Sequence, residues 1–577
     1  MKRYGKYIRP YWYAFILGPL LMLTEVAGEV LLPSFMADII NIGAANHDVG
    51  YIVQKGIIMI LTALIMMAGG VGGAWFASVA AINFGAGLRK DAFKKIQTFS
   101  FSEIDRFSTG SLVTRLTNDI TQVQNLIMMA LRMMLRAPGM LIGAIIMAFL
   151  MNRELAAVFL VILPVMTVAI ILLLRIAYPR FEFMQKKLDA LNSNIQEVLT
   201  NVRVIKSFVR EDYESARFEK SNAELKESSL NAFKIAVAQM PLMMLFMNLT
   251  TLVVVWLGGN QILDGKMQVG DLTAFTTYIV QVLMSLMMLA MVFLQSSRAF
   301  ASGRRINEVM DTQVSLTDDH AAYLEAVVKS GKIEFQNVSF RYYKDSAEKV
   351  LDQINLTIEP GQMIGIIGST GCGKTTLVSM IPRLYDVDEG KVLVDGIDVR
   401  DYSLNHLREG VGMVLQKNVL FSGTIEENLQ WGDENASKDQ IREAAESAQA
   451  EGFIQKLADG YDTELGQGGV NVSGGQKQRL CIARALLKRP KILILDDSTS
   501  AVDTATEAKI REAFSTTLKE TTKLIIAQRI GSVMEADQIV VMDEGKIVGL
   551  GKHEDLLETC KAYQEIYDSQ MKKEVIA

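Results

Sequence analysis

Residues 364–375, which read IGIIGSTGCGKT, decide the fold of the C-terminal half. The first four residues form a short apolar run rich in isoleucine, which predicts a buried strand. The next eight have the spacing of a P-loop, in its required context of strand, loop and helix. Such a loop wraps phosphates with backbone N–H groups. Its lysine contacts the β- and γ-phosphates, and its threonine hydroxyl can bind Mg²⁺. The candidate phosphate-binding residues are Gly368, Ser369, Thr370, Gly371, Cys372, Gly373, Lys374, Thr375 and Thr376.

A second buried strand is predicted at 492–495 and ends in Asp496. An acid at the carboxyl end of a strand can hold Mg²⁺. Between the two strands, residues 472–479 read VSGGQKQR, in which a serine and two glycine amides precede a helical pattern. That arrangement predicts an anion site that points outward. From about residue 330 onward, short apolar runs alternate with helical patterns, which predicts an α/β domain.

The N-terminal part has a different composition. Half of the 577 residues are apolar and 21% are charged, which suggests membrane segments and argues against a disordered, collagen-like or basic nucleic-acid-binding chain. Residues 1–325 carry a net charge of +4 and the remainder −9, which indicates two domains in different surroundings. A span needs about 20 apolar residues, and six runs qualify: 14–40, 57–85, 125–151, 155–178, 238–263 and 272–297.

The placement of Lys and Arg predicts the orientation of these spans. Positive charges gather in 87–125 and 178–239, whereas the opposite connections are short and carry few. The N-terminus and the C-terminal domain are therefore expected in the cytosol, with the two long inner connections as helical extensions of the spans. The first apolar run is too long for a cleaved signal peptide. All three cysteines lie in the C-terminal part, which is expected to be reduced.

Two pairs of charged residues fall inside the spans. Glu25 and Glu29 lie four residues apart and share a helix face, as do Arg132 and Arg136. Ionisable groups at membrane depth are functional candidates, so the acidic pair predicts a cavity that prefers cationic amphiphiles. The alternative is that the two pairs neutralise each other. Methionines such as Met284 and Met288 are also candidate substrate contacts, although methionine equally fills packing gaps.

Together these motifs resemble those of ABC transporters, specifically an exporter half-transporter. The resemblance covers essentially the whole chain and implies an α-helical six-span transmembrane domain followed by an α/β P-loop ATPase domain. It divides the chain into a membrane domain at 1–310, a linker at 311–330 and an ATPase domain at 331–577. It also implies short coupling helices near 100–108 and 208–217.

The resemblance assigns further roles at the nucleotide site. Tyr342 matches the aromatic residue that stacks on adenine, and 500–503 matches the D-loop. The implied cofactors are ATP and Mg²⁺, with Thr375, Gln416 and Asp496 as metal ligands. The signature motif matches Ser473, Gly474, Gly475 and Gln476. In this family ATP lies between the P-loop of one subunit and the signature motif of another, so a chain with one of each must pair.

Two residues around the hydrolysed phosphate depart from the family pattern. Asp497 stands where the family has a catalytic glutamate, and Gln528 stands where it has a switch histidine. The shorter carboxylate is pulled back by about 1.5 Å, and misplacement of this order costs about 10²-fold in rate. Glutamine can donate a hydrogen bond but cannot carry charge as imidazole can. With Asp496 these are the expected catalytic residues, and they predict a site that binds ATP but hydrolyses it weakly.

The resulting expectation is a multidrug-type exporter of amphipathic compounds in the cytoplasmic membrane, from a bacterium. Its partners would be the lipid bilayer, a small amphipathic substrate and a different half-transporter that carries the consensus glutamate and histidine, with no nucleic acid. Three alternatives stay open. They are a dedicated lipid, peptide or porphyrin exporter, a homodimer with an aspartate base, and an ATP-gated membrane module without transport.

Overall fold

The structure is a computed structural model that describes residues 4–319, 321–344, 347–497 and 503–574. It divides into two compact units. The first comprises Met1–Ile96 and Gly110–Asp311, and the second Gln97–Thr109 and Thr312–Ala577. Residues 500–502 of the predicted D-loop lie outside the described part of the chain.

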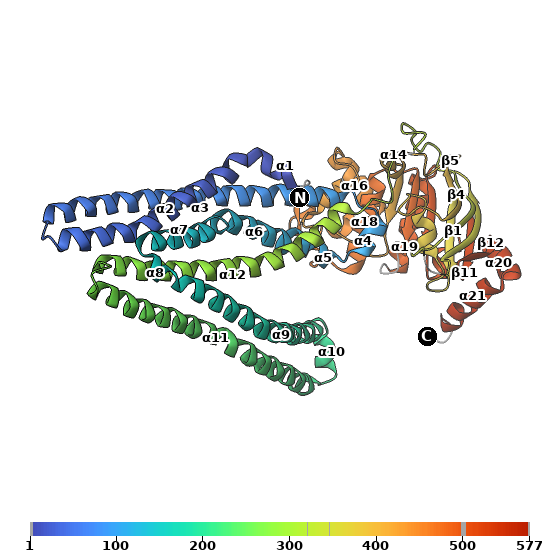
Figure 1. Cartoon of the computed structure of the whole chain (residues 1–577). Helices are drawn as coiled ribbons and strands as arrows, with labels where there is room; N and C mark the ends of the chain where they lie inside the picture. Colours follow the sequence, from blue (N-terminus) through green and yellow to red (C-terminus); the bar gives the residue numbers. More distant parts are fainter. Residues whose placement is uncertain (1–3, 320, 345–346, 498–502, 575–577) are drawn as a thin grey trace. The chain divides into compact units, whose positions relative to one another are not determined.

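The first unit is helical (Figure 1). Within the described residues it holds six helical segments that are long and apolar enough to cross a membrane, as predicted. The predicted extensions are helical as well, because α3, α9 and α11 each continue without a break past their apolar stretch. The main helices are α1 (Gly5–Ile8), α2 (Trp12–Asp38), α3 (Val49–Gln97), α5 (Thr109–Thr114), α6 (Ile120–Met133), α7 (Arg136–Met151), α8 (Arg153–Ala156), α9 (Val158–Thr200), α10 (Val202–Ser207), α11 (Glu211–Leu263) and α12 (Val269–Asp311).

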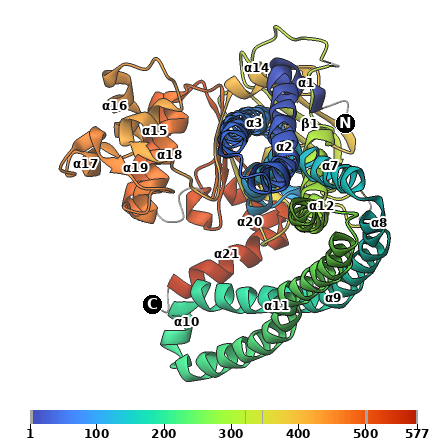
Figure 2. The same ribbon diagram turned by 60° about the vertical axis from the view of Figure 1, so that its left-hand side comes forward.

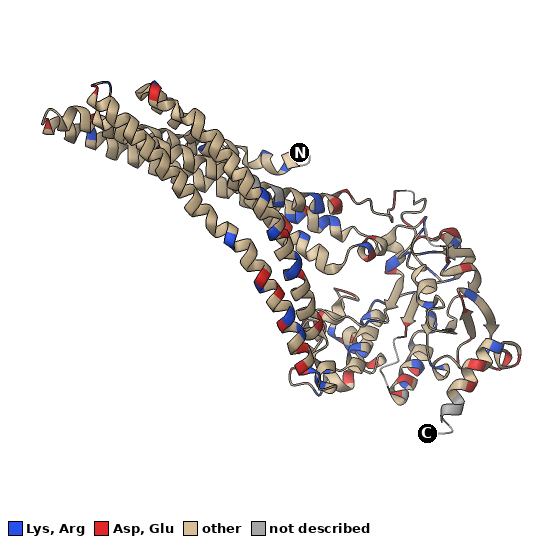
Figure 3. Cartoon of the chain, turned by 60° about the horizontal axis from the view of Figure 1, so that its bottom comes forward, with Lys and Arg blue, Asp and Glu red and all other residues tan. Residues whose placement is uncertain are grey.

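Helices α9 and α11 lie side by side and are joined through α10, which lies just before the coupling segment predicted at 208–217 (Figure 2). Their charged residues gather toward the ends that meet α10, while the opposite halves are almost free of charged residues (Figure 3). Helices α2, α7 and α12 enclose a core in which the Tyr278 hydroxyl donates to the carbonyl of Val30 at 2.9 Å.

Small residues bring α2 and α3 close together. A Cβ atom added to Gly73 would lie 3.0 Å from the carbonyl oxygen of Gly18, and one added to Gly69 would lie 2.9 Å from that of Leu21. Glycines at such contacts let two membrane helices approach backbone to backbone, which is how helices associate where no hydrophobic effect drives them together.

The second unit contains the α/β domain. A six-stranded sheet has the order β12-β11-β3-β10-β9-β6, and only β12 runs antiparallel to its neighbour. A four-stranded antiparallel sheet has the order β2-β1-β4-β5, and β7 pairs with β8. The strands are β1 (Ile333–Phe340), β2 (Leu351–Ile358), β3 (Met363–Gly368), β4 (Glu389–Val394), β5 (Ile397–Asp398), β6 (Val411–Val414), β7 (Gly423–Thr424), β8 (Glu464–Leu465), β9 (Ile492–Asp496), β10 (Thr522–Ile526), β11 (Gln538–Asp543) and β12 (Lys546–Gly551).

The six-stranded sheet is covered on both faces, which is why its central strands are continuous apolar runs. Along β9, Ile492 and Ile494 face the core shared with the antiparallel sheet, whereas Leu493 and Leu495 face the core formed with α18. The helices of this unit are α4 (Phe101–Arg106), α13 (Lys374–Ser379), α14 (Leu404–Glu409), α15 (Ile425–Gln430), α16 (Lys438–Ser447), α17 (Glu451–Ile454), α18 (Gly474–Leu487), α19 (Thr504–Thr517), α20 (His553–Thr559) and α21 (Lys561–Glu574).

Candidate functional site

Four adjacent parallel strands deliver the predicted nucleotide-site residues to one edge of the sheet. The P-loop follows β3, and Gln528 follows β10. Asp496 ends β9 with Asp497 directly after it, and Gln416 follows β6. The carboxyl ends of parallel strands are where ligands bind in open α/β sheets. The P-loop, Tyr342, Gln416, both aspartates and Gln528 together line one pocket of about 780 Å³.

The P-loop glycines are required by its backbone path. Gly368, Gly371 and Gly373 have φ values of 155°, 84° and 97°, in the region that L side chains rarely adopt. A Cβ atom on Gly368 would lie 2.1 Å from the carbonyl oxygen of Met542. The Lys374 ammonium donates to the carbonyl oxygens of Gly368 and Ser369 at 2.8 and 2.7 Å. These loop carbonyls hold the lysine at the phosphate end of the pocket.

Thr375 and Asp496 form the candidate metal position. The Thr375 hydroxyl donates to Oδ2 of Asp496 at 2.9 Å, and Asp496 is buried. Burial raises the pKa of Asp496, because the charged carboxylate loses hydration. A hydroxyl and a carboxylate are hard oxygen ligands of the kind Mg²⁺ uses together with substrate phosphates, so this pair fits the ion. When bound, Mg²⁺ would neutralise charge on the phosphate oxygens.

Asp497 lies beside Asp496 and is held by a glutamine. The Gln528 Nε2 atom donates to Oδ2 of Asp497 at 2.6 Å. The Asp497 backbone has φ of 48°, a left-handed conformation that aspartate tolerates better than longer side chains. Burial raises the pKa of Asp497, while hydrogen bonds from Gln416 and Gln528 act to lower it. The two residues that depart from the family pattern therefore contact each other directly.

Tyr342 lies at the other end of the pocket. Its hydroxyl and that of Thr376 lie 2.9 Å apart, and its ring is 44% exposed, which leaves a face on which a base could stack. The ring packs edge-on against Tyr385, whose hydroxyl donates to Oδ2 of Asp105 on α4 at 2.6 Å. The short helix α4 coincides with the coupling segment predicted near 100–108.

The signature residues lie apart from this pocket. Ser473 caps α18, and its backbone N–H donates to the Gln476 side chain at 2.9 Å, which forms a capping box. Ser473 and Gly474 are exposed, and Gly475 and Gln476 are half-buried. None of these four residues is among the described residues that line the P-loop pocket. Within one chain, therefore, the structure does not bring the two halves of the expected ATP site together.

Helix α21 contributes residues that sequence reasoning missed. Glu565, Ser569 and Gln570 line the P-loop pocket. The Gln570 Nε2 atom donates to the Gln528 carbonyl at 2.8 Å, and the Ile530 N–H donates to Gln570 Oε1 at 2.9 Å. Gln570 thereby fixes the backbone of the segment that carries Gln528. No motif marks α21, and a contact across 40 residues leaves no local signal.

The charged residues of the spans do meet. Arg136 lies 3.1 Å from Glu25 and 3.3 Å from Glu29. Arg132 lines the same pocket as Glu25 and Arg136, which measures about 500 Å³. Met284 and Met288 are not among the described residues that line that pocket; Met284 is exposed and Met288 is half-buried. Met284 and Met288 therefore do not belong to the pocket that holds the charged residues.

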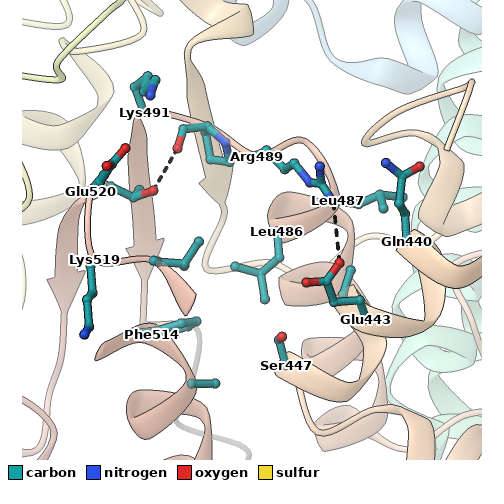
Figure 4. Close-up of a pocket in the computed structure, with 15 residues that line it drawn as sticks. Gln440, Glu443, Ser447, Leu486, Leu487, Arg489, Lys491, Phe514, Lys519 and Glu520 are labelled. Atoms are coloured by element: carbon teal, nitrogen blue, oxygen red, sulfur yellow. Dashed lines mark hydrogen bonds and ion pairs between the residues drawn. The ribbon is translucent and has the colours of Figure 1, made fainter. Parts of the chain in front are cut away.

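A further cavity of about 530 Å³ lies between α16, α18 and α19 (Figure 4). Its charged lining residues have both signs, and Arg489 pairs with Glu443 at 3.4 Å. It holds none of the motif residues, so the nucleotide is assigned to the P-loop pocket.

Comparison with known proteins identifies the family. The ABC transporter transmembrane region matches residues 15–286, and the ABC transporter ATPase family matches 351–500. The chain is 42% identical over 574 residues to the uncharacterized ABC transporter ATP-binding protein YfiB of Bacillus subtilis, which covers 100% of this chain and 99% of that protein. The chain belongs to the ABC transporter family. It is also 34% identical to the ATP-dependent lipid A-core flippase of Desulfotalea psychrophila, over 84% of each chain.

The likeness extends to a solved ABC exporter. A bacterial Atm1-family ABC exporter with ATP bound superposes with a TM-score of 0.79 at 25% identity, over 98% of both chains. The predicted fold is thereby confirmed. An ABC exporter of this architecture is a multi-pass membrane protein that couples ATP hydrolysis to transport. Half-transporters of this kind function as dimers, which accounts for the signature residues that lie away from the chain's own P-loop.

Proposed function

We propose that this ABC exporter is one half of a heterodimer that exports hydrophobic or amphipathic compounds across the cytoplasmic membrane of a bacterium. In this proposal residues 1–310 form the membrane domain, 311–330 the linker and 331–577 the cytosolic ATPase domain. The chain's own P-loop belongs to an ATP site that hydrolyses weakly. The hydrogen bond between Gln528 and Asp497 is the observation that carries the proposal.

A general base must reach the attacking water and accept its proton. Asp497 is one methylene shorter than the family's glutamate, and its left-handed backbone and its bond to Gln528 fix its carboxylate in place. A displacement of about 1 Å costs about 10²-fold in rate. Gln528 offers an amide where the family has an imidazole, so it can orient the γ-phosphate by a hydrogen bond but adds no charge.

The signature motif keeps its binding chemistry. Ser473 and the first amides of α18 present an exposed anion-binding surface at the N-terminus of a 14-residue helix. In the proposed heterodimer this surface completes the ATP site on the partner's P-loop, where a consensus glutamate and histidine carry hydrolysis. This chain would thus contribute one weak half-site and one competent half-site.

A dedicated lipid exporter is the second candidate. It is favoured by the 34% identity to proteins named ATP-dependent lipid A-core flippase. The two candidates differ in the compound that is transported when ATP is hydrolysed. Inside-out vesicles that contain both chains should accumulate an amphipathic dye for a multidrug exporter, and should translocate a labelled lipid but no dye for a lipid exporter. No ATP-dependent accumulation of either probe would instead indicate an ATP-gated module without transport.

The ATPase rate tests the heterodimer. The purified chain alone should hydrolyse ATP negligibly, and the chain with its co-purifying partner should do so robustly. Equal rates with and without the partner, both abolished by Asp497→Ala, would indicate a homodimer with an aspartate base and would overturn the proposal.

A further inference from the structure

The charged cluster between α2, α3, α6 and α7 is balanced in charge overall but not pair by pair. Glu25 and Glu29 share one guanidinium, that of Arg136, at 3.1 and 3.3 Å. This trio retains one negative charge. Arg132 has no ion pair among the residues that the structure describes, and it retains one positive charge. The pocket of about 500 Å³ is thus lined by Arg132, which has no ion pair among the described residues, and by Glu25, whose partner Arg136 is shared with Glu29.

Individual atoms of these side chains also lack hydrogen-bond partners. In the part of the chain that the structure describes, Glu25 Oε2 and the Nε atoms of Arg132 and Arg136 are buried without a hydrogen-bond partner. Buried polar atoms are normally paired, and an unpaired charge at membrane depth is costly. Glu25 and Arg132 therefore each keep charge and hydrogen-bonding capacity that their neighbours do not fully satisfy. A ligand that carries both a positive and a negative group would complement both.

The surroundings of the charges suit an apolar tail. Met66 and Met67 of α3 line the pocket beside Glu25, and methionine adapts its shape to varied apolar groups. Gly70 lets the carboxylate lie against α3, because a Cβ atom there would lie 2.9 Å from Glu25 Oε2. A volume of about 500 Å³ falls within the range of small-molecule sites.

From this arrangement we propose that the pocket binds the head of a zwitterionic amphiphile, with its anionic group on Arg132 and its ammonium group on Glu25. The inference rests on the proposed export function and names the class of substrate. It replaces the expectation of a cationic amphiphile, because Arg132 lines the same pocket without an ion pair among the described residues and so adds a position for an anionic group.

Three probes with the same dodecyl tail isolate the contribution of the head: dodecylphosphocholine, dodecyl phosphate and dodecyltrimethylammonium. Each is radiolabelled and bound, without nucleotide, to the immobilised full chain with its co-purifying partner, in an uncharged maltoside detergent. The wild type should bind the phosphocholine about tenfold more tightly than either the anionic or the cationic probe, as expected for one additional charge–charge contact, which a quaternary ammonium makes without a hydrogen bond. Equal binding of the three probes, or preference for the anionic or the cationic one, would overturn the inference.

Variants should switch the preference in opposite directions. Arg132→Gln leaves the negative trio and should favour the cation, whereas Glu25→Gln leaves Arg132 and should favour the anion. Arg132→Lys keeps the charge and should keep the preference for phosphocholine, which protects the test if Arg132→Gln fails to assemble. Arg153→Gln, outside the lining of this pocket, is the matched control and should change nothing. An unchanged preference in both charge variants would contradict the proposal.

Binding without nucleotide separates this inference from the proposed function. Partner-dependent ATP hydrolysis with no selectivity among the heads would remove the zwitterion site and leave the exporter proposal intact. Selective binding without partner-dependent hydrolysis would do the reverse. If the site is occupied by a membrane phospholipid, phosphatidylethanolamine added in mixed maltoside micelles should compete with the phosphocholine probe. A soluble zwitterionic amphiphile as the natural ligand predicts no such competition.

Discussion

The amide of Gln528 donates a 2.6 Å hydrogen bond to the carboxylate of Asp497, so the two departures from the ABC family pattern form one contact. Gln570 of α21 in turn accepts from Ile530 and donates to the Gln528 carbonyl. Hydrogen bonds therefore fix both the side chain of Gln528 and the backbone from Gln528 to Ile530. This network fixes the shorter carboxylate where it is, which supports the proposal of a site that binds nucleotide and cleaves it weakly.

Restoring both consensus residues should raise hydrolysis at this site. The double variant Asp497→Glu with Gln528→His lengthens the base and returns an imidazole. It should increase hydrolysis at this chain's P-loop by about 10²-fold, because misplacement of a catalytic group by about 1 Å has that cost. The readout is the ATPase rate of the two-chain complex in which the partner's own P-loop lysine is replaced by alanine. Asp439→Glu, an exposed one-methylene extension on α16, is the control and should have no effect.

The contact between Tyr385 and Asp105 should stabilise α4. Burial and the neighbouring carboxylate raise the pKa of Tyr385 well above its ordinary range, so its hydroxyl remains a donor at physiological pH. Tyr385→Phe should lower the local opening free energy of α4 by about 1.5–3 kcal/mol, the usual worth of a hydrogen bond to a charged group. Hydrogen exchange of the α4 amides measures this change.

A double-mutant cycle with Asp105→Asn checks that the effect is specific. The two single changes should not add, because they remove the same interaction. Tyr343→Phe is the control, since that ring is 78% exposed. Additive effects, or equal effects of the control, would show that α4 is held by other contacts.

The close approach of α3 to Glu25 should make Gly70 intolerant of a side chain. Gly70→Ala places a Cβ atom 2.9 Å from the Glu25 carboxylate. It should lower the stability of the membrane domain by about 1–3 kcal/mol, as overpacking does. Gly56→Ala on the same helix meets nothing within 4 Å and should stabilise it by up to about 1 kcal/mol. Thermal unfolding in detergent compares the two, and equal shifts would mean that the carboxylate moves aside freely.

The pKa of Asp496 predicts a pH-dependent effect in the nucleotide-free protein. Burial raises this pKa, so the protonated form is favoured in the folded state. The stability contributed by this group is present below the ordinary aspartate pKa and is lost as pH rises through the folded value. Asp496→Asn should therefore raise the melting temperature at neutral pH without Mg²⁺, and the gain should shrink in acid.

Mg²⁺ should stabilise the wild type more strongly than the variant in this experiment. Added Mg²⁺ with ATP should stabilise the wild type more than Asp496→Asn, because the variant lacks the carboxylate that faces the metal position. Asp439→Asn serves as the surface control. A variant that is less stable than the wild type at neutral pH would contradict the account of Asp496.

Local patterns were enough to predict much of the fold. The six spans follow from uninterrupted apolar length, and β3 and β9 follow from short apolar runs next to glycine and aspartate. The P-loop, Asp496, Asp497 and Gln528 share one pocket because the chain places each of them directly after a parallel strand. Strand ends that meet at one sheet edge make this part of the site predictable from spacing alone.

Other features depend on contacts between distant parts of the chain. The left-handed backbone of Asp497, the bond from Tyr385 to Asp105 and the bridge through Gln570 leave no mark in any local window. The acidic pair of α2 was recognised as unusual, but only the packing of α6 and α7 beside it shows that Arg136, and not Arg132, takes both carboxylates. Charge pairing in a helical membrane domain depends on helix rotation, which composition does not determine.

The chemical state of the nucleotide on each chain tests the central claim most directly. The two-chain complex would turn over α-³²P-labelled 8-azido-ATP with Mg²⁺, be freed of unbound nucleotide, be photocrosslinked and be separated into its chains. The account predicts that this chain retains mainly ATP and its partner mainly ADP, and that Lys374→Ala removes the label from this chain alone. Equal proportions of ADP on both chains would contradict a weakly hydrolysing site.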